Sequence, residues 1–238
     1  MSSQIIPGPG GTGPGAASPH APSAANSIRM VRLLGTVSLM CGLLIVVTNL
    51  ATKDRIQSNQ ETITRESVAE LLPGTSKQVT YGVEPSGELK VLTGAAGEGK
   101  KFFAGYDGSG KLVGVVIEAG ERGYADVISA LYSYSPATQT IIGFKVVDMR
   151  ETPGLGDRIK SDIPFLANFK NLDAKVENGK EVHNITTVKH GTKKNAWEID
   201  AISGATISSR AVGRMLQKSV EDVTPVILKN LDRIERGN

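Results

Sequence analysis

The chain has 238 residues and a formal net charge of +3, which allows one sizeable domain with extensions. Its lysines and arginines are scattered among acidic residues, without the clustered stripe that is typical of nucleic-acid-binding proteins. The single cysteine, Cys41, excludes an internal disulfide and a cysteine-ligated iron–sulfur site. No carboxylate-bearing motif frames His183 or His190, so we expect surface histidines there and no metal site.

Residues 1–28 are rich in glycine, proline, alanine and serine and contain no charged side chain. Such a segment cannot bury enough apolar surface to offset the entropy lost on ordering, so we predict a disordered leader. Gly8, Gly10 and Gly13 match the spacing of a dinucleotide-binding loop, but prolines interrupt them and no strand precedes them. We therefore reject that interpretation.

The stretch from Leu33 to Thr52 contains no charged residue and is long enough to cross the hydrocarbon core of a bilayer as a helix. The sequence thus predicts a transmembrane helix over residues 29–52. A cleaved signal peptide is disfavoured because the uncharged leader is long and no small-residue cleavage site follows. Basic residues flank the span almost equally, so their count is a tie or leans slightly towards a cytoplasmic C-terminal domain.

Apolar side chains keep helical spacing between Ile56 and Leu72, and Pro73 follows. This pattern predicts a juxtamembrane helix over residues 53–74. Residues 75–238 are then expected to form the folded domain.

Two hairpins are predicted within this domain, because short alternating segments flank turn-forming residues. The turns are expected at residues 107–110 and 135–139, with further strands at 77–83 and 89–92. Adjacent hairpins favour an antiparallel sheet and an α+β fold over a doubly wound one. Two predicted helices close the chain, with Pro225 marking a break or kink between them.

The polar stretch 171–194 is expected to be a surface excursion with a turn at Asn178-Gly179. The segment that follows it carries the most informative pattern of the chain. Residues 196–199 alternate as in a short strand, and a helix with one apolar face is predicted after residue 206.

Between that strand and helix, Gly204 and Ala205 lie in a turn that leaves the Thr206 hydroxyl near a helix N-terminus. Free N–H groups and the positive end of the helix dipole suit an anion such as phosphate. Ser208 or Ser209 is expected to cap the helix. On these residues alone, an ordinary turn with a cap remains an alternative.

A second shaped loop spans residues 150–157, where Pro153 lies among glycines that allow a close approach of the backbone. A plain turn before a short helix at 157–161 is the alternative.

These two motifs resemble those of the covalent-FMN domain. That family includes the G subunit of Rnf electron-transport complexes and the C subunit of sodium-translocating NADH:quinone reductases. The first motif is carried by Asp200, Ser203, Gly204, Ala205, Thr206 and Ser209, and the second by the loop from Glu151 to Gly156. Tyr124 matches the family's Gly-Tyr stretch more loosely, with Ala125 and Asp126 where glycines are usual.

The resemblance implies that FMN is held by a phosphoester bond to Thr206, placed there by a separate flavin transferase. It implies no catalytic residue and no metal. The cofactor-binding residues that it implies are Thr206, Ser203, Gly204, Ala205, Ser209, Asp200, Glu151, Thr152, Gly154, Leu155, Gly156 and Tyr124.

The function implied is that of a membrane-anchored flavoprotein subunit that relays electrons within an ion-translocating complex. Its expected partners are the other membrane subunits of an Rnf-like complex, and no turnover of substrate by the subunit alone is expected. The family places the flavin domain on the periplasmic side of the inner membrane. The alternatives are an FMN-bearing regulatory or sensor module, and a Ser or Thr hydrolase, for which no base frames the hydroxyls.

Overall fold

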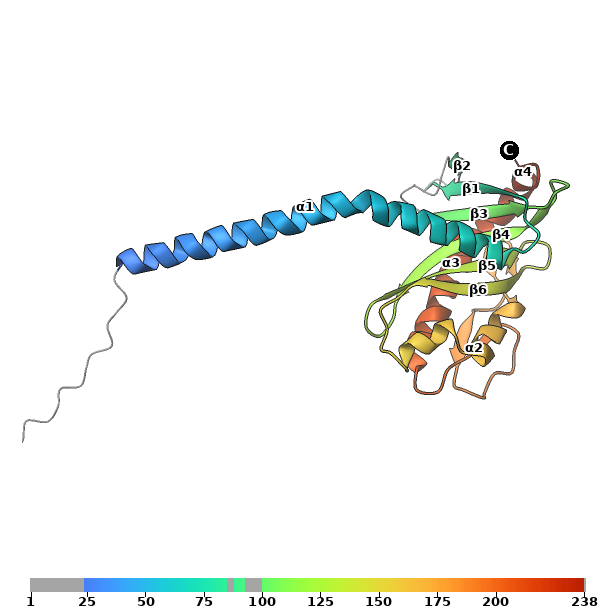
Figure 1. Ribbon diagram of the computed structural model, residues 1–238. Coiled ribbons are helices and arrows are strands. Elements are labelled where there is room, and N and C mark those ends of the chain that lie inside the picture. The colour runs from blue at the N-terminus through green and yellow to red at the C-terminus, as the bar shows by residue number, and fades with distance from the viewer. Residues whose placement is uncertain (1–23, 85–87, 93–99, 238) are drawn as a thin grey trace, which may run out of the picture. The chain divides into compact units, whose positions relative to one another are not determined.

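A computed structural model describes residues 24–84, 88–92 and 100–237. The predicted leader lies outside these residues, except for residues 24–28, which are helical. The chain divides into two compact units, Met1–Ile56 and Gln57–Asn238. The second unit holds all the strands of the described residues (Figure 1).

Helix α1 runs from Ala24 to Leu71. Its segment Ile28–Lys53 has a mean hydropathy of 2.2 and is long and apolar enough to span a membrane. The large apolar side chains of this segment are exposed. The hydroxyls of Thr36, Thr48 and Thr52 each donate to the carbonyl four residues earlier, so these polar groups are satisfied within the helix.

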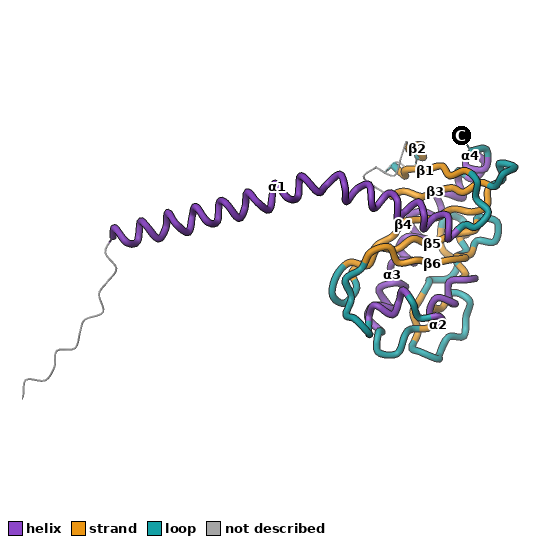
Figure 2. Tube along the Cα trace, in the orientation of Figure 1, coloured by secondary structure: helices purple, strands orange, loops and turns teal. Residues whose placement is uncertain are grey.

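A seven-stranded antiparallel sheet forms the centre of the second unit (Figures 1 and 2). Its strand order is β2-β1-β3-β4-β5-β6-β7. The strands are β1 Lys77–Val83, β2 Leu89–Leu92, β3 Lys100–Tyr106, β4 Leu112–Arg122, β5 Val127–Ser135, β6 Thr140–Asp148 and β7 Leu172–Asp173.

Both predicted hairpins are confirmed, as β3–β4 and β5–β6. In the first turn, the Asp107 carboxylate accepts hydrogen bonds from the N–H groups of Ser109 and Lys111 at 2.8 and 2.9 Å. In the second, the N–H of Gln139 donates to the carbonyl of Ser135. Local hydrogen bonds of this kind stabilise tight turns, and the two hairpins were predicted from the residue types that form them.

The two faces of the sheet are covered by different helices, because neighbouring strand residues point to opposite sides. Phe102 faces the large core that includes helix α3, whereas Phe103 packs with Val68 and Leu72 at the end of α1. Helix α3, Thr206–Lys229, therefore lies on the face opposite the last turns of α1 (Figure 1).

The segment between β6 and α3 folds into short elements. They are the 3-10 helix η1 Gly156–Lys160, α2 Ile163–Ala167, the 3-10 helix η2 Asn168–Lys170, and the strands β8 Val176–Glu177, β9 Lys180–Glu181, β10 Thr186–Val188 and β11 Glu198–Asp200. The expected turn at Asn178-Gly179 is confirmed and has positive φ at both residues. The prediction that residues 171–194 form a surface excursion is only partly right, since Ile185 is buried and β10 pairs in parallel with β11.

The sequence predicted a break or kink at Pro225, and the break is excluded because α3 continues through this residue to Lys229. Val223 and Ile227, on either side of the proline, are both buried against the sheet. This packing outweighs the one backbone hydrogen bond that proline cannot donate. A short helix, α4 Leu231–Glu235, then ends the domain.

Candidate functional site

A cavity of about 430 Å³ lies where the loop after β6 meets the start of α3. Its volume is within the range typical of small-molecule sites. The apolar side chains at its wall are exposed, with 65% of Tyr124, 50% of Leu155 and 51% of Ile207 accessible. Its lining residues are Tyr124, Glu151, Thr152, Leu155, Gly156, Gly204, Ala205, Thr206, Ile207 and Ser208.

The turn between β11 and α3 places Thr206 in the lining of this cavity. The turn is closed by the Ala205 N–H, which donates to the carbonyl of Ile202 at 3.1 Å. Gly204 has a φ of +83°, a conformation that favours glycine. Thr206 is partly exposed, and its hydroxyl bonds no other residue in the described part of the chain.

The first turn of α3 also presents free backbone donors. The N–H groups of Thr206, Ile207 and Ser208 have no hydrogen-bond acceptor within the described ranges, whereas that of Ser209 donates to the Ala205 carbonyl. Unsatisfied N–H groups at a helix start carry partial positive charge. The site can therefore bind an anionic group next to the threonine hydroxyl.

Neither serine caps α3, so that prediction is wrong. Ala205 occupies the N-cap position and makes no side-chain cap. Ser209 instead lies inside the first turn, where its hydroxyl donates to the Ala205 carbonyl at 2.9 Å and accepts from the Ile202 N–H at 3.1 Å. This fully buried side chain stabilises the turn between β11 and α3 and does not line the cavity.

Glu151 forms part of the cavity floor and is only 8% exposed. Its Oε1 accepts from the N–H groups of Tyr124 and Ala125 at 2.9 and 3.1 Å, and its Oε2 accepts from the Ser208 hydroxyl at 2.7 Å. The carboxylate thus joins three segments that are distant in sequence. Such charge-assisted hydrogen bonds are stronger than neutral ones.

Two glycines leave room for this carboxylate. A Cβ on Gly123 would lie 2.3 Å from Oε1 of Glu151, and a Cβ on Gly156 would lie 2.5 Å from Oε2. Gly154 differs, since it has a φ of +76° and open space around its Cβ position. The glycines of the second loop therefore serve the packing of Glu151 and the shape of the turn.

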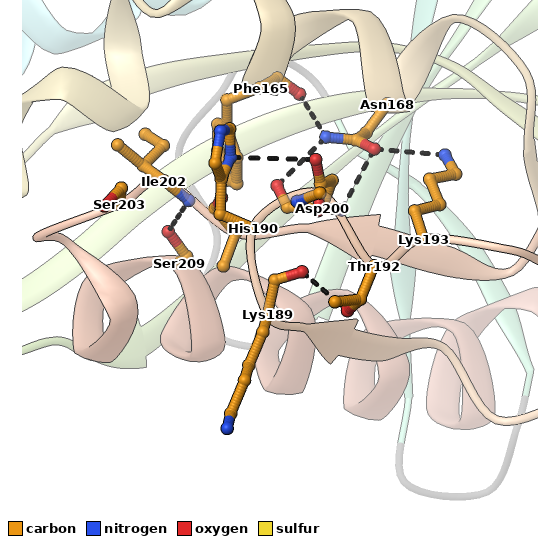
Figure 3. Close-up of polar contacts among 12 residues, drawn as sticks. Phe165, Asn168, Lys189, His190, Thr192, Lys193, Asp200, Ile202, Ser203 and Ser209 are labelled. Atoms are coloured by element: carbon orange, nitrogen blue, oxygen red, sulfur yellow. Dashed lines mark hydrogen bonds and ion pairs between the residues drawn. The ribbon is translucent and has the colours of Figure 1, made fainter.

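Asp200 does not line the cavity and belongs instead to a polar network with Asn168 and its neighbours (Figure 3). Its Oδ1 accepts from the N–H of Gly191 at 2.7 Å, and the neighbouring carbonyl of Ala201 lies 2.9 Å from Nδ1 of His190. Lys193 reaches the same network, and partial burial lowers the pKa of its ammonium, with Asp200 opposing the shift.

Four predicted site residues do not line the cavity: Asp200, Ser203, Ser209 and Gly154. Ser203 is exposed, and its carbonyl accepts from Arg158 at 3.4 Å. Neither sequence motif indicated Ile207 as a wall residue or Ser208 as the partner of Glu151. An apolar residue at the exposed start of an amphipathic helix was the available signal for Ile207.

The described residues contain no group of three or more histidine, cysteine or acidic side chains that could hold a metal ion. His183 instead stacks on Trp197, with ring centroids 3.8 Å apart and ring planes at 4°. This contact lies beside β11, which leads to the turn that contains Gly204 and Ala205.

The FMN-binding domain family matches residues 123–221, a range that includes both loops of the cavity. The G subunit of the ion-translocating oxidoreductase complex of Methanosarcina acetivorans is 30% identical to this chain over 199 residues, covering 82% of this chain and 94% of the relative. The chain belongs to this G-subunit family. A second member, the G subunit of the Na⁺-translocating ferredoxin:NAD⁺ oxidoreductase complex of Acetobacterium woodii, is 27% identical over 79% of this chain and 87% of its own.

Solved structures share the fold of this G-subunit family member. The C subunit of the Na⁺-translocating NADH-quinone reductase of Parabacteroides distasonis superposes with a TM-score of 0.57 at 20% identity, covering 73% of this chain and 96% of that one. NqrC of Shewanella oneidensis gives a TM-score of 0.52 at 23% identity, covering 69% and 87%. The α+β fold class predicted from the sequence is confirmed, with a long apolar N-terminal helix before an antiparallel-sheet FMN-binding domain.

Proposed function

We propose that this protein is a membrane-anchored electron carrier in which FMN is joined to Thr206 by a phosphoester bond. One observation carries the proposal: Thr206 lines the cavity with its hydroxyl unbonded within the described residues, at a helix start that has three free backbone N–H groups. A phosphate bound there would satisfy those donors and benefit from the helix dipole. The ester would form between Oγ1 of Thr206 and phosphorus, as the hydroxyl loses its proton and the pyrophosphate bond of a flavin dinucleotide supplied by the transferase breaks to release a nucleoside monophosphate.

The cavity residues fit the rest of the cofactor. Leu155, Ile207 and Tyr124 would cover the flat ring system and exclude water, and Thr152 offers a hydroxyl at its edge. When bound, FMN supplies one- and two-electron chemistry, while the protein sets its position and its potential. Glu151 would hold the wall segments in place without contacting the reacting atoms.

Membrane anchoring fits this function. We propose a transmembrane segment at residues 29–52, a juxtamembrane helix at 53–74 and an FMN domain at 75–238, with the domain on the periplasmic side. The related G subunits are named as parts of ion-translocating oxidoreductase complexes. By analogy, the partners of this chain are the other membrane subunits of such a complex, and a flavin transferase for maturation.

The attachment is tested by co-expressing the full chain with a flavin transferase. Peptide mass spectrometry should find the mass of FMN less one water on the peptide that contains Thr206. Thr206→Val keeps the shape of the side chain and removes the oxygen, so flavin fluorescence in a denaturing gel should disappear. Thr152→Val is the matched control, because it removes a hydroxyl from the same cavity and should leave the adduct in place. An adduct that persists in Thr206→Val would refute the proposal.

A further inference from the structure

Asn168 is a buried polar residue that neither sequence motif contains. It opens η2, downstream of the second loop through η1 and α2, and its side chain is only 6% exposed. The residue does not line the cavity, yet its side chain bonds the strand that leads to Thr206 (Figure 3).

The Asn168 amide bonds both main-chain groups of Asp200. Its Oδ1 accepts from the Asp200 N–H at 3.1 Å, and its Nδ2 donates to the Asp200 carbonyl at 3.3 Å. Nδ2 also donates to the carbonyl of Phe165 at 2.9 Å, and Oδ1 accepts from the Lys193 ammonium at 3.0 Å. These partners fix the orientation of the amide, since carbonyls require the NH₂ group and the ammonium requires the oxygen.

This arrangement makes Asn168 act as a strand partner for the end of β11. On the other edge, β10 pairs with β11, and the Ala201 N–H donates to the carbonyl of Val188 at 3.1 Å. The last residue of the strand is therefore held from both sides, immediately before the turn that carries Thr206. A side-chain amide can do this because it offers one donor and one acceptor group in a plane.

We propose that Asn168 is a positioning residue for FMN attachment, which sets the position of the Thr206 hydroxyl by fixing the main chain of Asp200. This inference rests on the proposed function of Thr206. It assigns the amide a role that Asp cannot fill, because a carboxylate oxygen in place of Nδ2 would face the carbonyls of Phe165 and Asp200 without a proton to share. The contact with Lys193 would be kept in such a variant.

The test compares Asn168→Asp with Asn171→Asp, the same change at an exposed residue. The unmodified full chains are incubated in detergent with a flavin transferase and its flavin substrate, and the initial rate of covalent labelling is read from gel fluorescence. At saturating transferase, we expect Asn168→Asp to be labelled at least about tenfold more slowly, because a displaced nucleophile lowers the rate of the chemical step. The KM for the unlabelled chain as acceptor should stay close to that of the parent. The labelling rate of Asn171→Asp should match that of the parent within about twofold.

Circular dichroism at the assay temperature separates positioning from loss of the fold. If Asn168→Asp is not folded, Asn168→Ser, which cannot bridge both groups of Asp200, takes its place. A folded Asn168 variant with the parent's labelling rate would overturn the positioning role. Unfolding of both variants would overturn it as well, because Asn168 would then be needed for folding alone. A parent chain that is never labelled on Thr206 would instead overturn the proposed function.

Discussion

Glu151 is the residue on which the cavity depends most directly. Its carboxylate accepts three hydrogen bonds, from the main chain of Tyr124 and Ala125 and from Ser208. Removal of this acceptor would leave buried donors unsatisfied, which costs more than the bonds themselves contribute. The structure thus explains a glutamate at the start of the second loop by what it holds together.

We expect Glu151→Ala to lower the free energy of unfolding by about 2–4 kcal/mol, since three donors lose their acceptor. Glu151→Gln keeps one oxygen for the two backbone N–H groups and should cost about 1 kcal/mol. Denaturant unfolding of the full chain in detergent measures both changes. Glu66→Ala, at an exposed position of α1, is the control and should change the unfolding free energy by less than about 0.5 kcal/mol.

The two glycines of the second loop should respond differently to the same substitution. In Gly156→Ala the new Cβ would meet Oε2 of Glu151 and the Ser208 hydroxyl at 2.5 and 2.7 Å, so the cavity floor must shift. We expect a changed flavin absorption spectrum or midpoint potential with covalent loading retained. In Gly154→Ala the new Cβ would meet open space, so the only cost is the backbone strain of a positive φ, which should lower the free energy of unfolding by about 1 kcal/mol. Identical flavin spectra and potentials in the parent and both variants would reduce this loop to a plain turn.

At the scale of the elements, the sequence predicted those parts of the fold that local chemistry decides. The hairpin turns follow from Asp107 and from the residues around Gln139, and α3 follows from its apolar face. The alternation at residues 196–199 indicated β11, but β10 and its pairing with β11 were harder to foresee, because a parallel pair depends on long-range contacts and carries no turn signal.

The residues of the candidate site also divide into those that local sequence motifs indicate and those that only long-range contacts reveal. Thr206 and Leu155 could be found from motif residues, and the cavity brings them together. Asn168 carries no local signal, since an asparagine in a polar stretch normally indicates a turn or a surface. Its role depends on two backbone groups 32 residues away, which only the tertiary structure brings into contact.

The β8–β9 hairpin should make stability depend on pH through Glu181. Burial, aided by the negative charge of Glu221, raises the pKa of Glu181 from its ordinary 4.5 to about 7. Between these values the folded protein binds more protons than the unfolded chain, so the free energy of unfolding should fall as pH rises from about 4.5 to 7. Both carboxylate oxygens are buried without a hydrogen-bond partner among the described residues, which agrees with this direction.

Denaturant midpoints measured across this pH range test the effect. Glu181→Gln should flatten the decline, whereas Glu177→Gln, at an exposed position of the same hairpin, should leave it unchanged. Equal slopes in the parent and in Glu181→Gln would mean that other groups cause the pH dependence.

For the whole molecule, the proposed topology makes the FMN domain accessible from outside the cell membrane. Ser109→Cys, in the exposed turn between β3 and β4, should react with an impermeant thiol reagent in intact spheroplasts of a Cys41→Ser strain. Ser23→Cys, before the span, should react only after lysis. The reverse pattern would place the domain in the cytoplasm and contradict the proposed orientation.

Trp197, on which His183 stacks, is a fluorophore whose emission can report on bound FMN. Trp197 is the only tryptophan of the chain, so all indole emission comes from one place, next to the strand that leads to the turn before Thr206. Because the near-ultraviolet absorption of oxidised flavin overlaps indole emission, attachment of FMN in the same domain should quench this emission by energy transfer. Reduction of the flavin should restore part of it. The redox state of the cofactor could thus be followed in the unlabelled protein.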